Sequence, residues 1–213
     1  DFGYNNLSWR DFSSFIENPL RENEILVKTL AIGVCYRDTI DIEGAFPFMK
    51  FPTVPGHEMC GEVVKASPSS PYKEGDIVIS MHGGPCGTCH YCINYDMYHC
   101  PNKKYFMWNI PGIYAEYVRG PWNAFLKVPP DVLKKYTPEE LCFTYCTAGT
   151  AYRALITKGN LTPDKFVLIT GAGGGVGIHA LQIAKAAGAT VIAVSSSPEK
   201  TDILKKYGAD YVI

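Results

Sequence analysis

The chain has 213 residues, enough for one large domain or two modest ones, and 46% of them are hydrophobic, so it can bury a proper core. Its 20 basic and 21 acidic residues are well mixed and leave a net charge of −1, which excludes a strongly charged surface for nucleic acid or an anionic membrane. The apolar runs are too short to span a bilayer, no signal peptide opens the chain, and the eight cysteines, four of them clustered, fit a reducing compartment. We therefore expect a soluble, cytoplasmic protein.

The first half of the chain has the pattern of a β-rich domain. Its apolar or alternating runs are short and end at glycine, proline or aspartate, which is typical of strands joined by turns. A Gly75-Asp76 turn separates two of them. Strands are predicted at residues 24–31, 61–66, 77–80, 113–118 and 125–128.

A cysteine-rich lobe interrupts this half. Cys86, Cys89, Cys92 and Cys100 follow a C-x2-C-x2-C-x7-C spacing in a loop rich in glycine and proline. Four thiolates this close in sequence suit one tetrahedral zinc ion, with Zn–S bonds of about 2.3 Å. A pair of local disulfides is the alternative, but a chain with this apolar content does not need such staples. We therefore predict a structural zinc lobe at residues 86–100.

From residue 137 onward the pattern changes to alternating helices and strands. Thr137-Pro138-Glu139-Glu140 is typical of a helix N-terminus, with Thr as the cap and an acid three residues on. The run at 166–170 is apolar, as in a buried parallel strand. The other predicted elements are a helix over 147–158, a helix from the glycine turn to residue 187, a strand at 190–194, a helix capped by Ser197-Pro198 and a strand beginning at residue 211.

This β-α-β-α-β order is the first half of a doubly wound sheet. Half of such a sheet leaves an unpaired apolar edge, which is an aggregation hazard in a free protein. We therefore expect the sequence to be an incomplete copy of a longer chain, with about 130 residues absent at the C-terminus and a strand absent at the front.

A glycine turn follows the first strand of this half and opens a helix. Gly171, Gly174 and Gly177 have a G-x-x-G-x-x-G spacing, with Gly175 and Val176 inside it. Backbone N–H groups and the helix N-terminus at such a turn bind a pyrophosphate. A glycine-rich turn in an unrelated sheet is the alternative, but the strand before it and the helix after it favour dinucleotide binding.

The end of the next strand selects the cofactor. NAD binding calls for an Asp or Glu there to hold the ribose diol, and this chain has Ser195 and Ser196 instead, followed by Lys200. Hydroxyls and a nearby lysine better accommodate a 2′-phosphate, which favours NADP(H) over NAD(H). Ser-Pro is also an ordinary helix cap.

Cys35, His57, Glu58 and Cys146 are the remaining candidates for chemistry. Two cysteines and one histidine make the donor set of a catalytic zinc that keeps a fourth position open. Each also has a structural explanation, because a lone histidine is usually a satisfied polar group, and the sequence alone does not show that the four converge. Three cysteines could instead be ordinary buried structural thiols, namely Cys60, Cys142 and Cys146.

These motifs resemble the zinc-containing medium-chain dehydrogenase/reductase family, which includes alcohol dehydrogenases and quinone reductases. The likeness runs from about residue 24 to the end of the chain. It rests on GVCYRD, GHE, the GD turn, the four-cysteine lobe, CTAGTAY and the glycine turn, in the family's order and approximate spacing. It implies an α/β protein, with a GroES-like β-rich catalytic domain over 1–147 and the first half of a Rossmann-type doubly wound parallel sheet over 148–213.

The resemblance also implies roles for single residues. Cys35, His57 and Cys146 are expected to bind a catalytic zinc with Glu58 beside it, in addition to the structural zinc. Asp38 matches the acid that orients the zinc-bound histidine. A small-molecule substrate and a homo-oligomer, dimer or tetramer, are implied as well.

Two positions depart from the alcohol dehydrogenases of this family. Arg37 stands where they have a Ser or Thr that passes the alcohol proton towards solvent, and Ile40 stands in place of a relay His. A guanidinium stays protonated and cannot relay a proton. The Tyr-Arg-Asp run and the glycine turn instead resemble the quinone-reductase and enoyl-reductase branches, and in particular archaeal-type acryloyl-CoA reductases. Arg37 either pairs with an acid, such as Asp38 or Glu58, or binds an anionic part of the substrate and steadies enolate charge.

The leading interpretation is therefore an NADPH-dependent, zinc-containing reductase acting on an activated enoyl thioester such as acryloyl-CoA. The alternative enzyme is a zinc alcohol dehydrogenase for small alcohols and aldehydes or ketones. A non-catalytic nucleotide-binding protein and a redox-sensing thiol protein are weaker hypotheses, because both presumed zinc sites are retained.

Overall fold

The computed structural model describes residues 7–11, 13–47 and 49–213. The chain forms two compact units, one ending at Phe143 and the other spanning Thr144–Ile213. The domain boundary predicted from the sequence lies four residues later, after residue 147. In the described part of the chain, no helix is long and apolar enough to cross a membrane.

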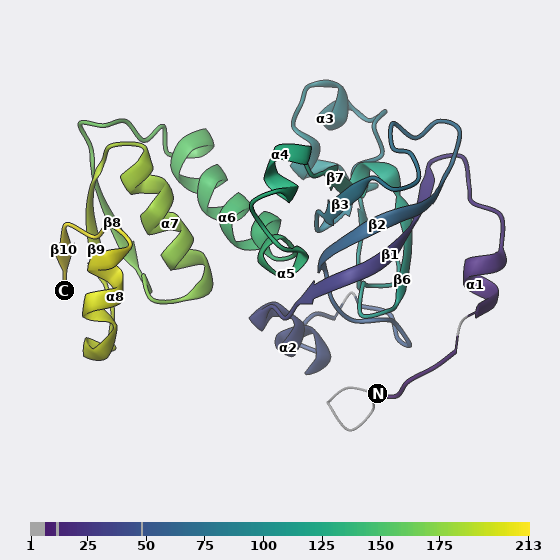
Figure 1. Cartoon of the computed structure of the whole chain (residues 1–213), viewed down its shortest axis with the longest axis horizontal. Coiled ribbons are helices and arrows are strands. Elements are labelled where there is room, and N and C mark those ends of the chain that lie inside the picture. Colours follow the sequence, from purple (N-terminus) through teal and green to yellow (C-terminus); the bar gives the residue numbers. More distant parts are fainter. Residues whose placement is uncertain (1–6, 12, 48) are drawn as a thin grey trace. The chain divides into compact units, whose positions relative to one another are not determined.

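An antiparallel sheet of five strands organises the first unit, in the order β6-β1-β2-β3-β7 (Figure 1). Strand β1 pairs with both β2 and β6, and its Ile25 and Val27 point into the core together with Met59 and Val63 of β2. The predictions of strands at 24–31, 61–66, 77–80 and 125–128 are confirmed in position. The five strands are β1 (Glu24–Gly33), β2 (Glu58–Ala66), β3 (Ile77–Ser80), β6 (Tyr117–Pro121) and β7 (Phe125–Lys127).

Shorter elements surround this sheet. A two-stranded ribbon of β4 (Gly83–Gly84) and β5 (Lys104–Tyr105) closes the base of the cysteine lobe. The predicted helix start is confirmed, because the Thr137 side chain accepts a hydrogen bond from the Glu140 N–H and the Glu140 carboxylate accepts one from the Thr137 N–H. The α-helices are α1 (Ser13–Glu17), α2 (Tyr36–Ile42), α3 (His90–Ile93), α4 (Pro130–Leu133) and α5 (Pro138–Leu141), and short 3-10 turns lie at Met97–His99 and Trp122–Ala124.

The strand predicted at 113–118 is wrong in its first half. Strand β6 begins only at Tyr117. The backbone N–H groups of Ile113 and Tyr114 donate instead to the carbonyl oxygens of Gly56 and Pro55. These loop hydrogen bonds replace strand pairing at Ile113 and Tyr114. They also place Tyr114 against Gly56, the residue before His57.

The second unit is a parallel sheet of three strands in the order β10-β9-β8. The predicted β-α-β-α-β order is confirmed, and Leu181, Val191 and Leu204 are fully buried where the helices meet the sheet. Figure 1 shows the helices beside these strands in the green-to-yellow part of the chain. The elements are α6 (Thr144–Tyr152), a π-helical segment η4 (Arg153–Lys158), β8 (Phe166–Thr170), α7 (Gly175–Ala186), β9 (Thr190–Val194), the 3-10 turn Pro198–Lys200, α8 (Thr201–Lys206) and β10 (Tyr211–Val212).

Two expectations for this unit need correction. Strand β8 is not buried on both faces, since Phe166 and Leu168 are 72% and 57% exposed. The described helices cover only the other face of the strand. The helix predicted at 147–158 begins earlier, at Thr144, and its hydrogen bonding changes to the π-helical pattern from Arg153 onward.

The core of the first unit gives a stability prediction. Replacing the fully buried Ile25 with Ala is expected to lower the free energy of unfolding by about 2–5 kcal/mol, through lost burial and a residual cavity. The matched control is Ile93→Ala, whose side chain is 66% exposed and whose effect should stay within about 0.5 kcal/mol. Urea denaturation of both variants measures the difference, and equal losses would contradict the assigned core.

Candidate active site and metal centre

Helix α2 begins at a cysteine that serves as its N-cap. Cys35 Sγ accepts a hydrogen bond from the Arg37 N–H at 3.4 Å, and the Cys35 N–H donates to Asp38 Oδ2 at 3.0 Å. The Cys35 side chain also accepts from the Asp38 N–H, and these reciprocal bonds between Cys35 and Asp38 form a capping box, with a thiol in place of the usual hydroxyl. The first turn of the helix therefore fixes this thiol and this carboxylate relative to each other.

The buried carboxylate of Asp38 is the centre of the site. Its Oδ1 lies 2.9 Å from Nδ1 of His57, and its Oδ2 accepts a hydrogen bond from the Tyr114 hydroxyl at 2.7 Å. Burial alone raises the pKa of Asp38, but the hydrogen bonds with His57, Tyr114 and the Cys35 N–H together hold it below its ordinary value. The carboxylate therefore stays ionised and orients the imidazole.

His57 is buried between charged and polar partners. Burial lowers the pKa of its imidazole, whereas hydrogen bonds with Asp38 and Cys35 raise it more strongly, to about 9. A ring that is held through one nitrogen by a carboxylate is oriented to bind a metal ion through the other nitrogen.

Glu58 joins these groups from the first position of β2. It pairs with Gly33 at the end of β1, where an added Cβ would lie 2.4 Å from Glu58 Oε2, so glycine leaves the room that this carboxylate needs. Donor atoms of Cys35, His57 and Glu58 lie within 4.8 Å of one another. This mixed sulfur, nitrogen and oxygen set has the chemistry of a catalytic zinc site. Cys146 lies in α6 of the second unit.

The structure pairs Arg37 with Asp41, one helical turn further on. Nε of the guanidinium donates to Asp41 Oδ1 at 3.1 Å. The Arg37 Cζ atom also lies 4.4 Å from the ring centroids of both Phe46 and Trp108. The arginine is therefore held in place, and its acidic partner is neither Asp38 nor Glu58.

His82 connects this aromatic cluster to the metal-binding candidates. Its ring centroid lies 4.9 Å from that of His57 and 5.2 Å from that of Trp108. Burial, together with the nearby positive charges of His57 and Arg37, lowers the pKa of His82 to about 3. Its imidazole is therefore neutral at pH 7.

The four clustered cysteines converge as predicted. The Sγ atoms of Cys89 and Cys92 are 3.5 Å apart, those of Cys86 and Cys92 are 3.9 Å apart, and all four Sγ atoms lie within 4.8 Å of one another. These distances exceed the roughly 2.05 Å of a disulfide bond, so the disulfide alternative is wrong. Sulfur atoms on a tetrahedral zinc are about 3.8 Å apart when each Zn–S bond is about 2.3 Å, so the donor set fits zinc.

The local backbone favours a thiolate at one corner of this set. Hydrogen bonds from the N–H groups of Thr88 and Cys89 lower the pKa of Cys86 to about 6. The N–H of Cys86 in turn donates to Cys100 Sγ at 3.3 Å. A thiolate that the backbone stabilises at this position is a suitable ligand for a cation.

The glycine turn has the conformation that an anion site requires. Gly171 lies in the left-handed region with a φ of +62°, and Gly174 is the N-cap of α7, which begins at Gly175. A Cβ at Gly177 would lie 2.2 Å from the carbonyl oxygen of Gly171, so no larger residue fits there. Val176 is exposed in the first turn of the helix. The turn can therefore bring a phosphate close to the backbone N–H groups of this twelve-residue helix.

Two of the predicted cofactor-selecting residues have defined contacts near this turn. Lys200 Nζ donates to the carbonyl oxygen of Gly173 at 3.3 Å, which places its ammonium group beside the glycine turn. Ser195 Oγ accepts a hydrogen bond from the Ser197 N–H at 3.2 Å, and Ser196 is exposed. The structure thus brings the lysine and the glycine turn together within the second unit.

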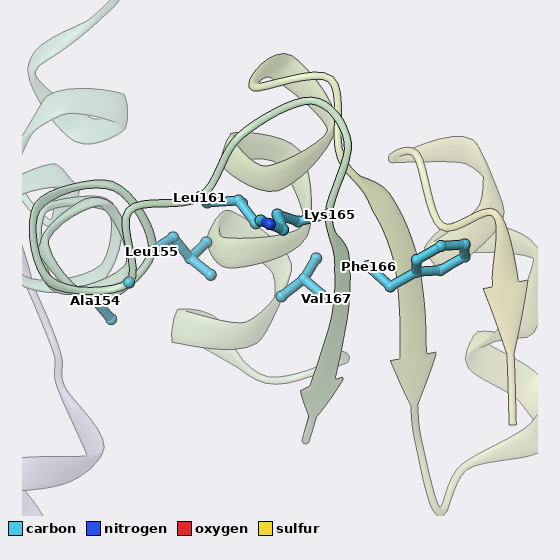
Figure 2. Close-up of a pocket in the computed structure, with 7 residues that line it drawn as sticks. Ala154, Leu155, Leu161, Lys165, Phe166 and Val167 are labelled. Carbon is cyan, nitrogen blue, oxygen red and sulfur yellow. The ribbon is translucent and has the colours of Figure 1, made fainter.

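A small hollow in the same unit does not belong to this site. Figure 2 shows it between the π-helical segment and the start of β8, where Leu155, Lys165 and Val167 line about 290 Å³. Dinucleotides bind at the carboxyl ends of parallel strands, and this hollow lies at the amino end of β8.

The partners of the candidate residues were not predicted from the sequence. Asp41 carried a usable signal, because an acid four residues after an arginine pairs with it on a helix. The aromatic partners come from distant loops, so neither spacing nor periodicity indicates them. The missed residues are Asp41, Phe46, His82, Trp108 and Tyr114.

Known protein families match both units. The alcohol dehydrogenase GroES-like domain family matches residues 21–130, and the zinc-binding dehydrogenase family matches residues 175–213. The chain is 39% identical over 191 residues to an acryloyl-coenzyme A reductase of Metallosphaera sedula, covering 89% of this chain and 56% of that relative. It is also 38% identical over 202 residues to an alcohol dehydrogenase of Geobacillus stearothermophilus, covering 93% and 58%.

A solved structure agrees with these matches. The cobalt- and zinc-bound thermostable alcohol dehydrogenase of Pyrobaculum aerophilum superposes with a TM-score of 0.87 at 28% identity, covering 100% of this chain and 63% of that one. The chain thus spans little more than half the length of the curated relatives that it matches.

The cysteine lobe gives a metal-content prediction. Replacing Cys92 with Ser is expected to remove one zinc per chain, because a tetrahedral structural site needs all four thiolates, and to lower the melting temperature. The control is Cys142→Ser, a buried thiol outside the lobe that donates to the Glu139 carbonyl and should leave zinc content unchanged. Zinc is measured by atomic emission on the purified proteins. An unchanged zinc content in the Cys92 variant would exclude the lobe as a zinc site.

Proposed function

Because the chain belongs to the zinc-containing medium-chain dehydrogenase/reductase family, we propose that it is an oxidoreductase, and specifically an NADPH-dependent reductase of an activated enoyl thioester such as acryloyl-CoA. The observation that carries this proposal is Arg37, a fixed guanidinium two residues after Cys35, where an alcohol dehydrogenase needs a proton-relaying hydroxyl. The similarity to the acryloyl-coenzyme A reductase of Metallosphaera sedula supports it.

We also propose the metal set that the sequence indicates. Cys35 and His57, with Cys146 as the third protein ligand, would hold the catalytic zinc, and Glu58 would lie beside it. The convergence of the three first-unit donors supports this assignment, as does the carboxylate that orients His57. A bound zinc would supply Lewis acidity at a substrate oxygen.

The proposed reaction is a conjugate reduction. A hydride from NADPH bonds to the β-carbon, the π electrons of the C=C bond shift to give an enolate with charge on the carbonyl oxygen, and a proton from water adds to the α-carbon. The thioester is reduced and NADPH becomes NADP⁺. In this scheme Arg37 stays protonated and stabilises the enolate oxygen, which is electrostatic work that a permanently charged donor can do.

A zinc alcohol dehydrogenase is the second candidate. The retained Cys35, His57 and Glu58 cluster favours it, and so does the similarity to the alcohol dehydrogenase of Geobacillus stearothermophilus. Arg37 and Ile40 count against it, because neither side chain relays a proton.

For the cofactor we propose NADP(H), held by the glycine turn with Ser195, Ser196 and Lys200 at the 2′-phosphate. The contact of Lys200 with the Gly173 carbonyl supports this, since it places a cation between the turn and the end of β9. A cytoplasmic location and a homo-oligomer are also proposed. Eight cysteines without a disulfide in the described chain support a reducing compartment.

The first test compares two substrates. The purified holoenzyme is expected to oxidise NADPH rapidly with acryloyl-CoA and at most slowly with a short aldehyde such as butanal, because Arg37 replaces the hydroxyl relay. Absorbance at the NADPH band follows both reactions side by side. Rapid aldehyde turnover with a silent thioester would instead establish the alcohol dehydrogenase alternative.

The second test concerns the cofactor. Replacing Lys200 with Ala is expected to raise KM for NADPH about 10-fold or more, because a charge-assisted hydrogen bond to phosphate contributes about 1.5–3 kcal/mol, while KM for NADH should change little. The control is Lys205→Ala, an exposed lysine of α8. Equal changes of KM for both cofactors would remove the assignment of Lys200 to the 2′-phosphate.

A further inference from the structure

The guanidinium of Arg37 lies in a cradle that fixes its plane. Asp41 anchors it from one side through the bond to Nε, and the aspartate itself is fully buried. The rings of Phe46 and Trp108 both lie against it, each with its centroid 4.4 Å from Cζ, and the two centroids are 6.0 Å apart. A cation against two aromatic rings gains electrostatic attraction from both, so the side chain is held in one geometry.

The ring of Trp108 is itself fixed by a tight turn. The N–H groups of Trp108 and Ile110 donate to the carbonyl oxygen of Tyr105, and the side chain of Asn109 spans the same turn. The rings of Tyr105 and Trp108 are 4.9 Å apart. The cradle is therefore built from helix α2, the segment after it and this turn, and not from one mobile loop.

The bond to Asp41 does not engage the whole guanidinium. The bond to Asp41 uses Nε, and Nη2 is buried with no hydrogen-bond partner in the described part of the chain. A buried charged donor without an acceptor is costly, and a ligand that supplies the acceptor removes that cost. His82 lies edge-to-face with Trp108 and tilted against His57, so it connects this cradle to the metal-binding candidates.

We propose that Asp41, Phe46 and Trp108 position Arg37 so that Nη2 donates to the carbonyl oxygen of the hydride acceptor, where negative charge develops during reduction. Arg37 touches the substrate in this assignment, and Asp41 is a positioning residue that acts through it. The inference rests on the proposed function, since an enoyl thioester supplies such an oxygen. Beyond that function, it identifies Nη2 as the atom that binds this oxygen, and Asp41, Phe46 and Trp108 as the residues that orient Nη2.

The test uses the holoenzyme with single substitutions. Arg37→Gln is expected to lower kcat for acryloyl-CoA about 10²–10³-fold, as for the loss of an oxyanion donor. Asp41→Asn is expected to lower kcat about 10–100-fold while KM changes less than about twofold, because the donor is present but no longer aimed. Trp108→Leu should act like Asp41→Asn, and Trp108→Phe, which keeps an aromatic face, should recover most of the activity.

Two further readouts separate positioning from damage to the fold. Zinc content should be unchanged in all four variants. In ¹⁵N-arginine spectra, the Nε–H of Arg37 should exchange with solvent slowly in the wild type and faster in the Asp41 variant, because the bond to Asp41 is lost. The control is Asp202→Asn, an exposed acid of α8, which should change none of these quantities.

The outcomes distinguish an error in the proposed substrate class from an error in the positioning role of Asp41. If the wild type reduces only aldehydes, the proposed substrate class is wrong, and the Asp41 and Trp108 variants are then judged by kcat with the aldehyde, whose oxygen also gains charge. Asp41→Asn with kcat within twofold of the wild type, on whichever substrate turns over, overturns the positioning role.

Discussion

The arrangement of the site depends on one buried carboxylate. An ionised aspartate inside a protein is costly unless polar partners surround its oxygens. The Cys35 N–H and the Tyr114 hydroxyl donate to Oδ2 of Asp38, and His57 Nδ1 lies 2.9 Å from its Oδ1. The cap of α2, the residue before β2 and the loop before β6 must all be in place before this charge is satisfied. The five-stranded sheet brings them together because the ends of β1 and β2 are paired.

This constraint also explains why the first turn of α2 carries so much of the chemistry. The capping box that starts the helix uses a metal-binding candidate, Cys35, as its cap and Asp38 as its third residue. Arg37, between them, contacts Asp41 and the rings of Phe46 and Trp108. One helical turn thus carries both Cys35, for the proposed metal, and Arg37, for the proposed substrate oxygen.

Local rules predicted much of this protein from its sequence. The strands at 166–170 and 190–194, the capping box at Thr137 and the convergence of the four lobe cysteines all follow from spacing and residue type within short segments. The interactions that escaped prediction are those that join distant segments. Nothing local indicates that Trp108 packs against Arg37, or that Ile113 and Tyr114 bond to the loop at 55–56 instead of entering a strand.

The contact of Tyr114 with Gly56 ties two distant positions together. Gly56 has a φ of +89°, and a Cβ there would lie 2.2 Å from the ring of Tyr114, whose hydroxyl holds Asp38. The missing side chain at residue 56 is thus the space that the tyrosine ring occupies. Any side chain at position 56 would therefore displace the ring of Tyr114, and with it the hydroxyl that holds the buried carboxylate of Asp38.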